Sequence, residues 1–313
     1  MKNSSIFFPL LSYQMLWQEG IAGTWKNIPA MICQSGDIIG SLNINIREGD
    51  NKMDRIFFFD IDGTVYRNTV GVTEKTKKAF ERLQKQGDYV FFSTGRLAPS
   101  IEPEFYDVLY DGYVGGNGTQ IVFREKQILN IPMDVTLLDQ VICFARQENR
   151  AFVLEGSEEL YSDSVECKTP LFHYGFYKQL LGKKMREVDA KGRSANKITL
   201  ILDDRPFEPK QYNNIMDRIK CIVHENECVE MGPKYCSKAS GADIVLRSLG
   251  ILRENSFAFG DSRNDLEILE YAGCGVAMGD APDVVKEKAD FVTGTVEEDG
   301  ISRALECLGI WDT

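Results

Sequence analysis

The sequence has few of the residues that build soft metal sites or disulfide frameworks. Only 2 histidines occur in 313 residues, and none of the 8 cysteines forms a Cys-x-x-Cys pair. The cysteines are scattered along the chain, at Cys33, Cys143, Cys167, Cys221, Cys228, Cys236, Cys274 and Cys307. This distribution predicts reduced thiols and a cytoplasmic location.

Positive charge and long apolar runs are also scarce. Lysine and arginine number 36 against 47 aspartates and glutamates, a net charge of -11 that argues against nucleic acid or an anionic membrane as partner. No window approaches the ~20 apolar residues of a membrane span. Residues 6–17 (IFFPLLSYQMLW) resemble a signal-peptide core, but only Lys2 is basic before them and no small-x-small cleavage site follows, so we do not expect secretion.

What is present is ordinary globular composition, 43% hydrophobic and 27% charged, with enough length for two domains. Residues 1–52 have no helical period and end in a polar run, so we expect an amino-terminal extension. One hypothesis is that Met53 is the true start and that the extension is not part of the native chain. The alternative is an arm packed on the surface.

The most informative segment is IFFFDIDGT at residues 56–64. Four consecutive apolar residues, Ile56 to Phe59, are typical of a strand buried on both faces of a parallel sheet. Asp60 would then emerge at the carboxyl end, where ligands of such sheets bind. Strand alternation predicts that Asp60 and Asp62 point the same way, and Gly63 allows a tight turn. Paired carboxylates of this kind ligate hard cations, attack electrophiles or move protons.

Further strands are predicted to end in polar residues. A helix over 73–86, capped by Thr73, precedes a strand over 88–92 that leads into Ser93-Thr94-Gly95-Arg96. Residues 110–123 predict a hairpin with a glycine-rich turn around Asn117. The strand 256–261 runs into Asp261-Ser262-Arg263-Asn264-Asp265, which alone would also suit a polar turn that caps a helix.

We therefore predict an α/β fold, a Rossmann-like parallel-sheet core with an inserted α/β cap domain. The core takes residues 53–134 and 235–313, and the insertion takes 135–234, with strands at 151–155, 197–202 and 221–225 and a helix at 136–149. A helix from Ser240 to Leu249 opens the second part of the core. Within the insertion, residues 156–196 appear irregular in sequence, and His173, Tyr174 and Tyr177 there are not assigned to the site.

These strand ends predict a magnesium and phosphate site. Asp60, the backbone carbonyl of Asp62 and Asp261 would ligate Mg²⁺ and leave room for a substrate phosphate. Asn264 and Asp265 would lie behind them and orient ligands. Lys238, in a serine-flanked loop shortly before a helix, is the candidate cation for the phosphate. The Thr94 hydroxyl and the Gly95 amide would be neutral donors.

Taken in order, FFFDIDGTVY, FFSTGR, SKASG and FGDSRNDLEIL resemble the four motifs of the haloacid dehalogenase-like phosphatases over about residues 54–313. The long insertion and the Asn117-Gly118 turn resemble the Cof-type sugar-phosphatase branch with an α/β cap. The resemblance implies that Asp60 is the nucleophile, forming an aspartyl phosphate, and that Asp62 is the acid/base. It also implies that Thr94 and Lys238 hold the phosphoryl group.

The same resemblance assigns the remaining site residues. Asp261 completes the magnesium site, Asp265 supports it, and Arg96, Asn117 and Asn264 reach the substrate or phosphate. Val65 and Tyr66 replace leucines that are common in this family, a change expected to alter substrate fit.

The implied activity is magnesium-dependent hydrolysis of a small phosphomonoester by a monomer or small homo-oligomer. Sugar phosphates are the first expectation, with flavin mononucleotide and pyridoxal phosphate as alternatives. A phosphomannomutase-like phosphotransferase would use the same residues, and a non-catalytic phosphate-binding regulator is a further alternative. A signalling receiver module is disfavoured, because receivers lack both an inserted cap and the second aspartate.

Overall fold

The computed structural model describes residues 55–101, 108–163, 185–189, 192–203, 205–224 and 227–311. The predicted extension, residues 1–52, lies outside these residues, as do His173, Tyr174 and Tyr177. Among the described helices, none has the length and apolar character needed to span a membrane. The six cysteines in the described part of the chain are free thiols: Cys143, Cys221, Cys228, Cys236, Cys274 and Cys307.

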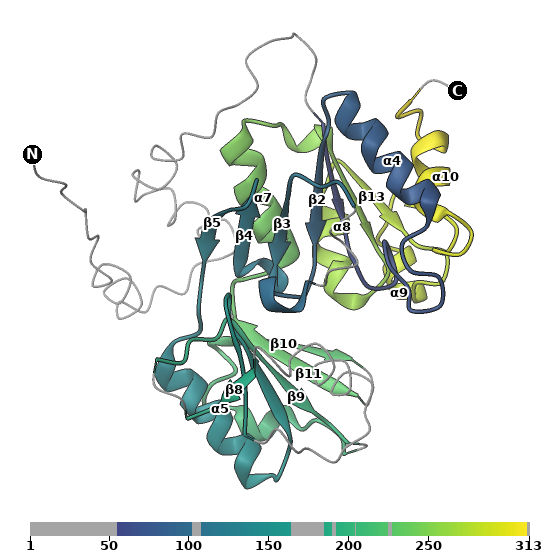
Figure 1. The fold of residues 1–313 in the computed structure, drawn as a ribbon. Helices are drawn as coiled ribbons and strands as arrows, with labels where there is room; N and C mark the ends of the chain where they lie inside the picture. Colours follow the sequence, from purple (N-terminus) through teal and green to yellow (C-terminus); the bar gives the residue numbers. More distant parts are fainter. Residues whose placement is uncertain are drawn as a thin grey trace, which may run out of the picture. The chain divides into compact units, whose positions relative to one another are not determined.

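The larger sheet has eight strands in the order β14-β13-β12-β1-β2-β3-β4-β5 (Figure 1). All neighbours from β14 to β3 are parallel, whereas β4 and β5 are antiparallel additions at one edge. The strands are β1 (Ile56–Phe59), β2 (Tyr89–Ser93), β3 (Gly112–Gly115), β4 (Gln120–Phe123), β5 (Lys126–Asn130), β12 (Ser256–Gly260), β13 (Cys274–Ala277) and β14 (Phe291–Val292).

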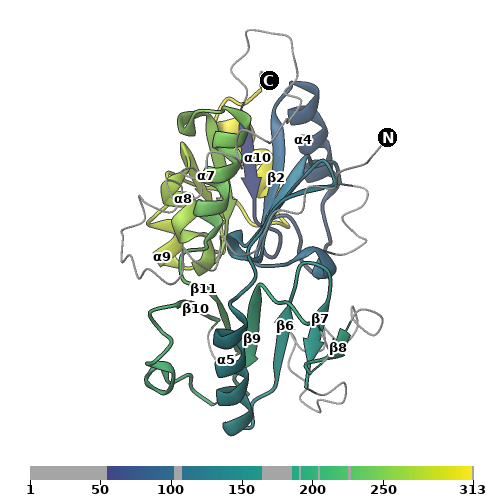
Figure 2. The ribbon, with the colours of Figure 1, turned by 90° about the vertical axis from the view of Figure 1, so that its left-hand side faces the viewer.

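Helices cover both faces of this sheet (Figure 2). One face packs against α4 (Glu74–Lys85) and α10 (Gly300–Cys307), and the other against α7 (Lys238–Leu249), α8 (Leu266–Tyr271) and α9 (Asp283–Lys286). The side chains of β1 alternate between the two cores: Phe57 and Phe59 enter the first, and Phe58 enters the second. A strand buried on both faces carries the uninterrupted apolar run that its sequence shows.

Strand β1 lies at the centre and pairs with β12 and β2, so that the ends of all three strands meet at one edge. The helix between β1 and β2 begins where predicted, because the Thr73 side chain accepts a hydrogen bond from the backbone N–H of Thr76. Ala79, Phe80 and Leu83 form its buried face. This βαβ unit positions two of the predicted site segments side by side.

The insertion forms a second, six-stranded sheet in the order β10-β11-β9-β6-β7-β8. Its neighbours are antiparallel except β7 and β8. Its helix α5 (Val135–Gln147) and the 3₁₀ helix η4 (Pro209–Tyr212) contribute to its own apolar core. The strands are β6 (Phe152–Glu155), β7 (Leu160–Ser162), β8 (Met185–Glu187), β9 (Lys197–Ile201), β10 (Ile219–His224) and β11 (Cys228–Pro233).

The predicted fold class, a Rossmann-like parallel-sheet core with an inserted α/β cap, is confirmed. Part of the segment that we expected to be irregular instead forms β7 and β8, whose three-residue lengths are too short for a clear alternating pattern. The two sheets are joined by hydrogen bonds between the end of β5 and the residue before β9, where Asn196 Nδ2 donates to Asn130 Oδ1 at 2.7 Å. The exact domain limits stay a prediction.

Candidate active site

Asp60 immediately follows the central strand, as predicted. Its backbone N–H donates to the carbonyl of Phe259 at 2.9 Å, so the residue remains tied to β12 after β1 ends. The residue is only 4% exposed. Burial raises the pKa of Asp60 well above its usual range, nearby carboxylates raise it further, and the charge of Lys238 opposes this.

Lys238 supplies the cation for this buried carboxylate. Its Nζ lies 2.6 Å from Oδ1 of Asp60 and 2.6 Å from Oδ1 of Asp265, and the residue is completely buried. Burial disfavours the ammonium, but attraction to Asp265 and Asp60 outweighs it and raises the pKa of Lys238. The lysine therefore remains charged within the protein.

The local setting of Lys238 differs from the prediction of a loop before a helix. It is the first residue of α7, because Ser237 and Ser240 form a reciprocal capping box around it. The glycine-rich turn packs tightly against this helix start, since a Cβ atom at Gly118 would lie 2.1 Å from the Ser237 carbonyl oxygen. These contacts fix where the lysine enters the site.

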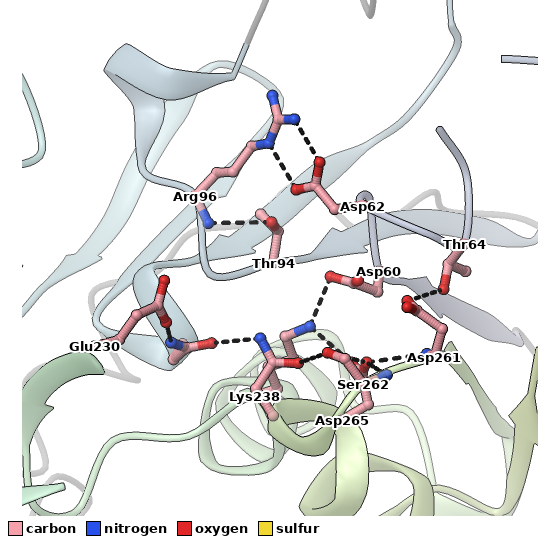
Figure 3. Close-up of polar contacts among 12 residues, drawn as sticks. Asp60, Asp62, Thr64, Thr94, Arg96, Glu230, Lys238, Asp261, Ser262 and Asp265 are labelled. Carbon is pink, nitrogen blue, oxygen red and sulfur yellow. Dashed lines mark hydrogen bonds and ion pairs between the residues drawn. The ribbon is translucent and has the colours of Figure 1, made fainter. Parts of the chain in front are cut away.

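Three carboxylates gather at the ends of β1 and β12. Oxygens of Asp60, Asp261 and Asp265 all lie within 4.8 Å of one another (Figure 3). Burial raises the pKa of Asp261 to about 7, with the charge of Asp265 as the next contribution. Such crowding of like charges is relieved by a divalent cation, and carboxylate oxygens are suitable ligands for a hard one.

The three carboxylates are not equally available to a cation. Oδ1 of Asp265 binds Lys238, and its Oδ2 accepts the backbone N–H groups of Asp261 and Ser262 at 3.1 and 3.0 Å. Asp60 contacts Lys238 through Oδ1 alone, and Asp261 accepts the Thr64 hydroxyl at Oδ1. The geometry thus fits a hard cation held by Asp60 and Asp261, with Asp265 orienting its neighbours.

Two glycines make this crowding possible. A Cβ atom at Gly63, where φ is +85°, would lie 2.3 Å from Oδ2 of Asp261. A Cβ atom at Gly260 would lie 2.4 Å from the carboxyl carbon of Asp265. Any side chain at either position would collide with a carboxylate of the cluster.

The carboxylate of Asp62 binds Arg96, whereas the carboxylate of Asp60 binds Lys238. Arg96 donates to both of its oxygens, from Nη2 at 2.6 Å and from Nε at 2.8 Å, and also to the Ser100 carbonyl at 3.1 Å. We expected strand alternation to bring Asp60 and Asp62 to one spot. Instead the chain leaves the strand after Phe59 and turns, with the Ile61 carbonyl accepting three successive backbone N–H groups, so alternation no longer applies.

Thr94 and Asn117 lie on neighbouring connections. The Thr94 hydroxyl oxygen accepts the Arg96 backbone N–H at 3.1 Å, which leaves its proton to be donated elsewhere. Asn117 has a left-handed backbone, φ 52° and ψ 43°, a conformation that asparagine tolerates. Its backbone N–H donates to the Thr94 carbonyl at 3.1 Å, so the turn is attached directly to the end of β2.

A chain of polar contacts continues from the core to the inserted sheet, and the sequence did not predict it. Asn264 accepts the Ser262 hydroxyl at 2.7 Å and donates to Asn117 Oδ1 at 3.4 Å. Asn117 Nδ2 then donates to Oε2 of Glu230, on β11, at 2.7 Å (Figure 3). A glutamate within an apolar strand was the available signal, but its partner is 113 residues away.

Tyr66 is half-buried, but Val65 is fully buried within the core on the α4 side of the sheet. Val65 therefore contributes to packing and does not present a side chain to a ligand, which corrects our expectation for it.

A sequence model of the haloacid dehalogenase-like hydrolases matches residues 57–305. The chain belongs to this family. Like other members it is an enzyme of the hydrolase class, and the predicted phosphatase class is confirmed.

Individual haloacid dehalogenase-like proteins extend the comparison. The chain is 30% identical to YkrA, a candidate phosphatase of Bacillus subtilis, over 82% of this chain and 98% of YkrA. It is 31% identical to the 5-amino-6-(5-phospho-D-ribitylamino)uracil phosphatase YitU of Bacillus subtilis, over 79% of this chain and 94% of YitU. The crystal structure of the subclass IIB sugar phosphatase BT4131 shares the fold, with a TM-score of 0.71 and 24% sequence identity. The match covers 82% of this chain and 100% of the BT4131 chain. The predicted α/β cap is confirmed as part of this fold.

Proposed function

We propose that this haloacid dehalogenase-like hydrolase is a magnesium-dependent phosphatase that hydrolyses a small phosphomonoester through an aspartyl phosphate on Asp60. The observation that carries the proposal is the pairing of buried Asp60 with buried Lys238, 2.6 Å apart, beside a cluster of carboxylates. A charged lysine at this position opposes the rise in the Asp60 pKa that burial causes, and it attracts the phosphate dianion. An aspartate with a purely structural role would not need the additional crowding by Asp261.

In the first step a carboxylate oxygen of Asp60 attacks phosphorus, and the ester oxygen leaves with a proton from Asp62. In the second step water attacks the same phosphorus, Asp62 takes the proton from water, and the Asp60 carboxylate is regenerated. Lys238 and the Thr94 hydroxyl hold the phosphoryl oxygens throughout. Asp60 and Asp261, with the Asp62 carbonyl, would hold Mg²⁺, which when bound offsets negative charge on the phosphate.

Arg96 is proposed to act through Asp62. Its two hydrogen bonds fix the direction of the carboxylate, and the arginine itself is anchored on the Ser100 carbonyl. We expected Arg96 to reach the substrate, but its guanidinium already has these partners. It is therefore a positioning residue for proton transfer.

The proposed substrate class is a small organic phosphate, with sugar and polyol phosphates first. YitU, named for its action on a phosphorylated ribitylamino uracil, supports testing polyol phosphates in particular. The six free cysteines of the described residues support a reducing, cytoplasmic setting.

The test is phosphate release with Mg²⁺ from sugar and polyol phosphates, flavin mononucleotide, pyridoxal phosphate and the ribitylamino uracil phosphate. The intact chain is compared with Asp60→Asn and with Asp283→Asn, a matched change at an exposed position on α9. We expect turnover to disappear in Asp60→Asn only. Full activity in Asp60→Asn would contradict the aspartyl phosphate. Phosphate transfer from one sugar to another without release would favour the phosphotransferase, and no reaction with any compound would favour a binding role.

A further inference from the structure

Glu230 brings a carboxylate from the inserted sheet to the loop that is proposed to hold phosphate. Its Oε2 accepts Asn117 Nδ2 at 2.7 Å. The same oxygen would lie 3.4 Å from a Cβ atom placed on Gly95, the residue that follows Thr94. In Figure 3 Glu230 lies at the opposite side of the site from Asp60 and Asp261. Glu230 is therefore next to the loop that is proposed to hold the phosphate.

The charged neighbours of this carboxylate favour its ionised form. Burial acts to raise the pKa of Glu230, but the charge of Lys197 and the nearby His224 outweigh it and hold the pKa well below its usual range. Lys197 Nζ contacts Oε1 of Glu230 at 2.5 Å and Oε1 of Glu155 at 3.1 Å, and the lysine side chain is 3% exposed. Lys197 thus binds two carboxylates. It contacts Glu230 through Oε1, which is not the oxygen that accepts the hydrogen bond from Asn117.

A pocket adjoins this carboxylate. Among the residues that line it are Gly116, Asn117, Lys197, Lys220, Ile222 and Glu230. Both lysines in this set are in ion pairs, Lys197 as described and Lys220 with Glu267 of α8. The group offered to a ligand near Asn117 is therefore Oε2 of Glu230, a carboxylate oxygen that accepts hydrogen bonds and repels anions. Besides Asn117, the Nε2 atom of His224 lies 3.7 Å from this oxygen.

We propose that Glu230 is a specificity residue, which selects phosphate esters with a hydroxyl or amino donor close to the phosphate and rejects esters with a second anionic group there. The inference rests on the proposed phosphatase function. A carboxylate oxygen has two lone pairs, so Oε2 can accept a substrate hydroxyl while it keeps Asn117. A substrate carboxylate in that place has no proton to donate and is repelled by the like charge of Glu230. This repulsion disfavours the competing substrate and so contributes to specificity.

Two compounds of nearly equal size test this inference. Glycerol 3-phosphate and 3-phosphoglycerate differ at the terminal carbon, which is a hydroxymethyl group in one and a carboxylate in the other. We expect the wild-type protein to show a kcat/KM roughly 10 to 100 times higher for glycerol 3-phosphate. For a compound that is not turned over, the inhibition constant against p-nitrophenyl phosphate replaces kcat/KM in the same comparison.

In the Glu230→Gln variant the ratio of kcat/KM for glycerol 3-phosphate to that for 3-phosphoglycerate should fall about tenfold. The change should come mainly from a higher kcat/KM for 3-phosphoglycerate, because the amide has no charge to repel its carboxylate. Glu187→Gln, at an exposed position on β8, should leave the ratio unchanged. Equal use of both compounds by the wild-type protein, which needs no variant, would overturn the inference, as would an unchanged ratio in a folded Glu230→Gln protein. Failure of the proposed function is distinct: the wild-type protein would then release no phosphate even from p-nitrophenyl phosphate.

Discussion

Replacement of Lys238 by methionine tests the electrostatic balance on which the site depends. The lysine is completely buried and lies 2.6 Å from each of two carboxylates, Asp60 and Asp265, which are 4% and 0% exposed. Methionine keeps most of the apolar stem and removes the charge. Two buried carboxylates would then face each other without a cation, beside a third from Asp261.

Breaking a buried ion pair by removing one partner costs about 3–5 kcal/mol of unfolding free energy. At ~2–4 °C per kcal/mol for a protein of this size, the midpoint of thermal unfolding should fall by roughly 6–20 °C. The assay is thermal and urea unfolding in EDTA at neutral pH, with Lys78→Met, at an exposed position on α4, as control. The same substitution made in an Asp60→Asn background should cost at least ~1 kcal/mol less, because one carboxylate is already neutral.

The reasoning would be refuted if Lys238→Met unfolded within ~1 kcal/mol of the wild-type protein. It would also be refuted if the cost were equal in the two backgrounds. Either result would mean that the cluster does not need the lysine for charge balance.

Three other predictions concern the same edge of the sheet. Arg96→Met should lower kcat about 10–100-fold for alkyl phosphates but much less for p-nitrophenyl phosphate, whose leaving group needs no proton; equal losses for both would contradict a positioning role. The pKa of Asp261 is raised to about 7, so its contribution to stability is complete below the unfolded value near 4 and is lost as pH rises through 7. In EDTA the unfolding free energy should therefore fall between about pH 4 and 7. Asp261→Asn or added Mg²⁺ should flatten that fall, as urea titrations at each pH will show. Gly63→Ala should weaken Mg²⁺ binding measured by calorimetry and lower the unfolding free energy by roughly 1–3 kcal/mol, because its Cβ atom would collide with Asp261. Gly71 has a similar positive φ but open space around it, so Gly71→Ala measures the cost of backbone strain without the collision.

The parallel core could be predicted because its signals are local. Ile56 to Phe59 are apolar in succession, Thr73 caps the next helix, and the structure has a strand and a helix at these positions. Once strands end at a common edge, the meeting of Asp60 with Asp261 follows from topology. This is why residues from distant motifs could be assigned to one site.

The direction of Asp62 and the position of Glu230 could not be predicted in this way. Asp62 follows a turn whose hydrogen bonds replace strand alternation, and its partner Arg96 is 34 residues away. Glu230 meets Asn117 only because the second sheet presents β11 to the glycine-rich turn. Neither contact has a periodicity or spacing that could be recognised in the sequence.

The central position of β1 has a consequence for synthesis of the chain on the ribosome. β1 pairs on one side with β2, about thirty residues later, but on the other side with β12, where Ile56 lies opposite Ser256. The nascent core therefore keeps an unpaired, phenylalanine-rich edge while the entire insertion is translated, which is the kind of species that aggregates or recruits chaperones. The bond between Asp60 and Lys238 spans 178 residues, so prematurely terminated products that end within the insertion lack the lysine that completes the site.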